Sequence, residues 1–91
     1  MRRFRNSDDL YGFVEELLEF LRSRQEVDLA DLLARANRYL SVSPAEHLNE
    51  VDLALTRVLV LRPKSVSGER EDEIRQVIRQ IAEGFDSAGG A

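Results

Sequence analysis

The stretch that decides the fold runs from Ser43 to Leu61 and reads SPAEHLNEVDLALTRVLVL. Ser43 is expected to cap a helix, because its hydroxyl can accept a hydrogen bond from a backbone N–H group left unpaired at the helix start. Glu46 stands three residues later, as in a capping box, and Pro44 falls at the first helical position, which proline tolerates. Pro63 cannot continue a helix, so this helix should end near Leu61.

Apolar residues cover more than one face of this predicted helix. One stripe has helical spacing and consists of Leu48, Val51, Leu55, Val58 and Leu59. Leu53 and Val60 lie seven residues apart on nearly the opposite side. Such a helix is either central in its domain or has one face on a partner, and the sequence leaves both interpretations open. A short strand over residues 57–61, which are rich in β-branched side chains, is the rival prediction, although no partner strand is visible.

Three further helices are predicted from apolar residues spaced three and four apart. They cover residues 7–24, 28–40 and 67–85, with Asp28 as the expected cap of the second. Their apolar stripes are Leu10, Phe13, Val14, Leu17, Leu18 and Leu21; Leu29, Leu32, Leu33, Ala36 and Leu40; and Ile74, Val77, Ile78, Ile81 and Phe85. Gly12 either permits a close approach of another helix or is incidental. The fold class expected is all-α, a compact four-helix bundle or orthogonal array with the third helix central.

Composition indicates one soluble domain. The chain has 91 residues, of which 43% are hydrophobic and 33% charged, and no cysteine. We expect a flexible basic arm at residues 1–6 with Phe4 as its anchor, one helical domain at 7–85 and a disordered tail at 86–91. No signal-peptide core and no apolar run of about 20 residues is visible, so the predicted location is cytoplasmic.

The residues give little support for catalysis or for a metal or cofactor site. His47 is the single histidine, and its spacing to Glu50 matches half of a His-x-x-Glu metal motif. A di-metal bundle needs a second such motif and further core-facing glutamates, so a surface histidine is the preferred interpretation. No glycine-rich phosphate loop or nucleophile motif occurs. The sequence therefore predicts a protein that is not an enzyme and has no metal and no cofactor.

The net charge of −4 and the extra apolar face of the helix at residues 43–61 favour a protein-interaction module. Such a module could be an adaptor, a regulator or a small inhibitor of a basic partner, as immunity proteins and antitoxins are. Its partner would be another protein or a second copy in a homodimer. The candidate interface residues are Leu53, Val60, Glu15, Glu16 and Glu19.

The alternative function is a DNA-binding transcriptional regulator. It would use an N-terminal arm and two arginines of the last helix; these residues are Arg2, Arg3, Arg5, Arg75 and Arg79. Acidic residues within 69–73 share that helix and would repel phosphate, and the overall acidity argues against nucleic-acid binding.

Overall fold

The computed structural model describes residues 4–61 and 63–83, and these residues form helices and connecting turns. The elements in chain order are α1 (Ser7–Ser23), α2 (Val27–Arg38), a short 3₁₀ turn η1 (Tyr39–Ser41), α3 (Pro44–Leu61) and α4 (Glu69–Ala82). The predicted all-α class is confirmed. The predicted tail at 86–91, the arginines at positions 2 and 3, and Phe85 lie outside the described residues.

Helix α3 begins and ends where the sequence predicts. The backbone N–H of Glu46 donates to Ser43 Oγ at 3.0 Å, and the last helical residue is Leu61. Ser43 N–H donates at 3.0 Å to the carbonyl of Tyr39 in η1, so this donor is satisfied without the return bond of a capping box. The rival prediction of a strand at residues 57–61 is wrong, because these residues continue the helix.

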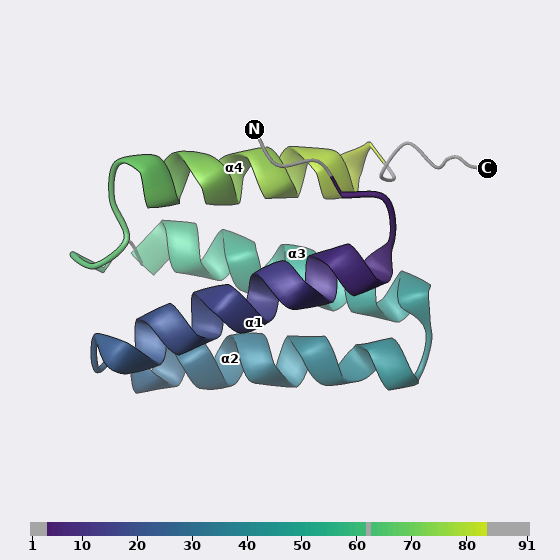
Figure 1. Cartoon of the computed structure of the whole chain (residues 1–91), viewed down its shortest axis with the longest axis horizontal. Coiled ribbons are helices and arrows are strands. Elements are labelled where there is room, and N and C mark those ends of the chain that lie inside the picture. The colour runs from purple at the N-terminus through teal and green to yellow at the C-terminus, as the bar shows by residue number, and fades with distance from the viewer. Residues whose placement is uncertain (1–3, 62, 84–91) are drawn as a thin grey trace.

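The third helix occupies the centre of the fold, as predicted. Helices α2, α3 and α4 lie side by side in that order, and α1 lies across the α2–α3 pair on the side facing the viewer (Figure 1). Because α3 contacts each of the other helices, its buried face needs apolar residues over a wider arc than a peripheral helix does.

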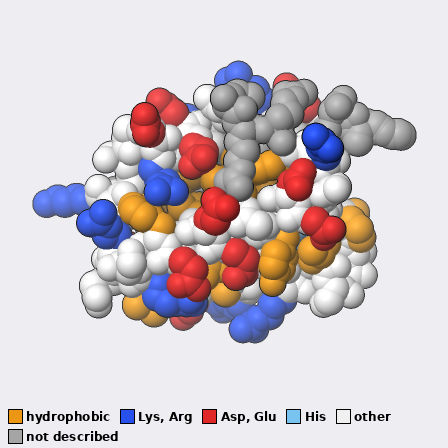
Figure 2. Space-filling model, in the orientation of Figure 1, with side chains coloured by type: hydrophobic (Ala, Val, Ile, Leu, Met, Phe, Trp, Pro, Cys, Tyr) orange, Lys and Arg blue, Asp and Glu red, His pale blue; other side chains and the backbone are white. Residues whose placement is uncertain are grey.

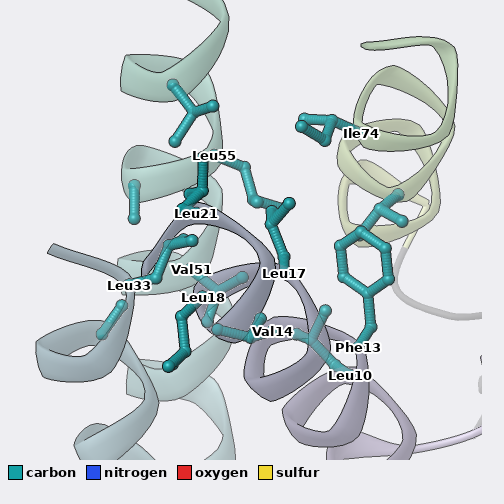
Figure 3. Packing of buried hydrophobic residues seen from close by; sticks show 14 of the residues in the cluster. Leu10, Phe13, Val14, Leu17, Leu18, Leu21, Leu33, Val51, Leu55 and Ile74 are labelled. Atoms are coloured by element: carbon teal, nitrogen blue, oxygen red, sulfur yellow. The ribbon is translucent and has the colours of Figure 1, made fainter. Parts of the chain in front are cut away.

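The core forms where α1 faces the other three helices (Figure 3). All six residues of the predicted α1 stripe are buried. The buried apolar residues contributed by the other helices are Leu29, Ala30, Leu33, Ala36, Val51, Ala54, Leu55, Val58, Ile74, Val77 and Ile81. Five residues of the predicted stripes, Leu32, Leu40, Leu48, Leu59 and Ile78, are only half-buried because they lie at the edge of these contacts.

The turn between α1 and α2 corrects one predicted helix start. Gln25 has a positive φ of 68°, and Glu26 N–H donates to the carbonyl of Leu21 at 2.8 Å. Gln25 N–H donates to the Arg22 carbonyl at 3.1 Å, which completes a Schellman motif that normally has glycine at this position. Helix α2 therefore begins at Val27, before the predicted start. Asp28 is not its cap but lies in its first turn.

Gly12 is not a point of close helix contact. A Cβ atom built at this position meets no described atom within 4 Å, other than its own helix and chain neighbours. The second of the two interpretations, an incidental glycine, is therefore the one that fits.

The segment before α1 is anchored in the fold through Phe4. This side chain is buried, and its ring centroid lies 5.7 Å from that of Phe13 in α1. Its backbone N–H donates at 2.9 Å to Oε1 of Gln80, a buried glutamine of α4. These contacts hold α4 against α1 across the start of the chain.

Candidate functional site

The candidate site is a groove between α2 and α3, which we call the α2–α3 groove. Its lining residues are Leu32, Arg35, Ala36, Tyr39, Glu50, Leu53, Ala54, Thr56, Arg57 and Val60. Helix α1 contributes nothing to this lining, so the groove lies outside the face that α1 covers. Two alanines, Ala36 and Ala54, are buried at the floor of the groove, where their small side chains leave space between the two helices.

Both apolar residues that the sequence predicts for an interface lie in this groove. Leu53 is 59% exposed and Val60 is 69% exposed, so neither belongs to the core of the monomer. Tyr39, which also lines the groove, is 38% exposed. Covering a leucine or valine side chain completely is worth about 1.5–3 kcal/mol, so this surface has a substantial free energy to gain from a partner.

The charged residues of the groove are of both signs. Glu50 lies on the same line of α3 as Leu53, and Arg57 follows one turn beyond Leu53. Arg35 of α2 adds a second positive charge. The groove is therefore not an acidic surface, and a basic partner is not what its charges favour.

The three glutamates that the sequence predicts for the same interface lie on α1, away from the groove. Glu15 Oε2 accepts a hydrogen bond from Asn37 of α2 at 3.1 Å, and Glu19 pairs with Arg22 at 3.0 Å. Glu16 is exposed. Acidic and basic side chains are mixed over the face that carries α1, without a broad region of one sign (Figure 2).

The prediction of a surface histidine is wrong, because His47 is fully buried with 0% exposure. Its ring Nε2 lies 2.9 Å from Oδ1 of Asn37, which is also buried. The ring lies 6.3 Å, centroid to centroid, from that of Tyr11 in α1. A signal was present in the sequence: His47 precedes Val51 by four residues, so helical spacing places it on the core face of α3.

The surrounding hydrogen bonds fix the tautomer of His47. The Asn37 amide nitrogen donates to the Tyr11 carbonyl at 3.2 Å and to Glu15 Oε2 at 3.1 Å, so the Asn37 oxygen must face the histidine. His47 Nε2 therefore carries the proton and donates. Nδ1 is an acceptor, and it is buried with no hydrogen-bond partner among the described residues.

Burial also holds His47 in its neutral form. Desolvation lowers its pKa below the ordinary value of 6.5, because the charged ring loses hydration. The Glu15 carboxylate reaches the ring only through the Asn37 amide, so it forms no direct ion pair with it. This histidine thus joins three helices as a structural polar group.

The described residues offer no metal site and no membrane span. No three His, Asp or Glu side chains within residues 4–61 and 63–83 are grouped closely enough to hold a metal ion. None of the helices in the same part of the chain is both long and apolar enough to cross a bilayer.

Two of the three arginines of α4 contact other side chains of the protein, and the third, Arg79, is exposed. Arg75 pairs with Glu71 one turn earlier. Arg70 lies over the ring of Phe20, 4.1 Å from its centroid, and its guanidinium is 3.8 Å from the Glu73 carboxylate.

Comparison of the chain with protein-family models, with curated proteins and with solved structures gives no match.

Proposed function

We propose that this protein is a non-catalytic interaction module that binds an amphipathic helix in the α2–α3 groove. The observation that carries the proposal is the exposure of Leu53 and Val60 on one line of α3, over a floor of small side chains. Exposed apolar side chains add no stability to the monomer, whereas a docking surface gains free energy when a partner covers them.

The shape of the groove supports a helix as the ligand. Two neighbouring helices form its walls, and a third helix with apolar residues at i, i+3 or i+4, and i+7 can rest between them. Glu50 at one end of the groove and Arg57 further along α3 favour a ligand helix with a basic residue and an acidic residue about two turns apart.

We further propose that the protein acts in the cytoplasm, which its cysteine-free sequence supports. DNA binding is the less favoured function. The engagement of Arg70 and Arg75 with other side chains of the protein weighs against a recognition surface on α4.

The test is photo-crosslinking in the cells that make the protein. A photoreactive residue at position 53 is compared with one at position 72, because Asp72 is also exposed but lies on α4, outside the groove. We expect an adduct only from position 53, its loss when Val60→Asp is added, and a crosslinked segment with helical apolar spacing. Equal labelling from both positions, or a crosslinked segment without that spacing, would overturn the proposal.

A further inference from the structure

We infer that the helix bound in the α2–α3 groove is α3 of a second copy of this chain, packed antiparallel across a two-fold axis beside Leu53. This inference rests on the proposed function and names the partner. Its basis is the order of charged and apolar residues along the groove.

Four groove residues follow one line of α3 at alternating spacings of three and four. They are Glu50, Leu53, Arg57 and Val60. Glu50 and Arg57 are two turns apart, about 10 Å along the axis at 1.5 Å per residue. The midpoint between these opposite charges falls beside Leu53.

Only one orientation of two such lines satisfies the charges. A parallel pair in register would place Glu50 against Glu50 and Arg57 against Arg57, and both contacts repel. An antiparallel pair centred beside Leu53 places Glu50 of each copy against Arg57 of the other. The two-fold axis therefore produces two ion pairs from a single glutamate and a single arginine, as a self-complementary interface requires.

The apolar residues agree with the same arrangement. Near the axis, each Leu53 meets the low floor formed by Ala36 and Ala54. Val60 lies beyond Arg57 at one end of the line, and Tyr39 lines the groove with Glu50. Reversal of the second helix brings its Val60 toward this Tyr39, so both exposed side chains become covered.

The first experiment measures molecular mass by sedimentation equilibrium over a concentration series. We expect a dimer for the natural chain and a monomer for Leu53→Asp, with unchanged helical circular dichroism because position 53 is exposed. Asp72→Asn is the matched surface control and should remain dimeric. A natural chain that stays monomeric at the highest concentration overturns the inference, as does a Leu53→Asp variant that still dimerises.

The second experiment tests the orientation by exchanging charges. Glu50→Arg alone, or Arg57→Glu alone, turns both inferred ion pairs into repulsive contacts and should weaken dimerisation by about tenfold or more. The double variant restores both pairs and should dimerise like the natural chain. An equimolar mixture of the two single variants should form a heterodimer. Single variants that dimerise as well as the natural chain overturn the antiparallel arrangement.

The two proposals fail in different ways. If the natural chain is a monomer but position 53 crosslinks to a helix of another protein, the proposed function holds and the second copy is ruled out. If position 53 gives no specific adduct and the chain is a monomer, both proposals fall.

Discussion

Acidification should weaken this fold through His47, whose ring is buried and neutral. In the folded protein, a second proton would have to enter at Nδ1, which has no acceptor within reach among the described residues. In the unfolded chain the ring takes up that proton freely, near the ordinary pKa of 6.5. The unfolded state therefore binds more protons below this pH.

The direction and size of the effect follow from this difference. Because the pKa is lowered in the folded state, the contribution of His47 to stability is complete above pH 6.5 and is lost as the pH falls. The free energy of unfolding should drop by up to about 1.4 kcal/mol per pH unit, until the pH reaches the folded-state pKa. The free energy of unfolding of a 91-residue chain is about 5–13 kcal/mol in total, so the loss over one pH unit is large enough to measure.

The assay is urea unfolding followed by helical circular dichroism between pH 5.5 and 7.5. His47→Gln is the matched variant, because a glutamine amide can still donate to Asn37 Oδ1 but does not titrate. The variant should be less stable at pH 7.5 and should lack most of the pH dependence. Parallel pH profiles for the two proteins would refute the account, since the remaining carboxylates are common to both.

Three further substitutions test the turn, the helix and the polar network, each by urea unfolding at pH 7.5. Asn37→Ala removes the partner of His47 and should cost about 1–3 kcal/mol; a loss below 0.5 kcal/mol would mean that water replaces the amide. Gln25→Gly relieves a positive φ and should stabilise by up to about 1 kcal/mol, whereas no gain would place the cost of this turn elsewhere. Gly12→Ala fills open space within α1 and should also stabilise by up to about 1 kcal/mol; destabilisation would reveal a contact that the added methyl group disturbs.

The helices could be predicted because their signals are local. The apolar spacing of α1 is a property of residues within that helix. The hydroxyl cap at Ser43 and the stop before Pro63 likewise depend only on residues next to the ends of α3. The sequence also separated Leu53 and Val60 from the core stripe, because they lie on nearly the opposite side of the helix, but it left open whether this second face is buried; the structure exposes both side chains.

Helical spacing places His47 on the core face of α3, but local signals do not reveal the partners that satisfy a buried polar side chain. Asn37 is buried because its amide meets the Tyr11 carbonyl, 26 positions away in another helix, and only the packed structure provides that acceptor. His47 depends in turn on Asn37, and Gln80 on the backbone of Phe4. Hydropathy assigns all three to solvent, since it measures a side chain without its partners.

The positive φ of Gln25 was not predicted, although the helix predicted for residues 7–24 already ended at this turn. Helix stops of this kind are recognised from glycine, and the strain of a positive φ is tolerated here because two backbone hydrogen bonds close the turn.

The contact of Phe4 with Gln80 has a practical consequence for protein engineering. Two positions separated by 76 residues are joined by one hydrogen bond, so the beginning and end of the helical unit meet at one corner. A unit of this form can be spliced into a surface loop of a host protein without forcing the host's flanking strands apart. Dimerisation through the α2–α3 groove would then link two host molecules, because neither Phe4 nor Gln80 lines that groove.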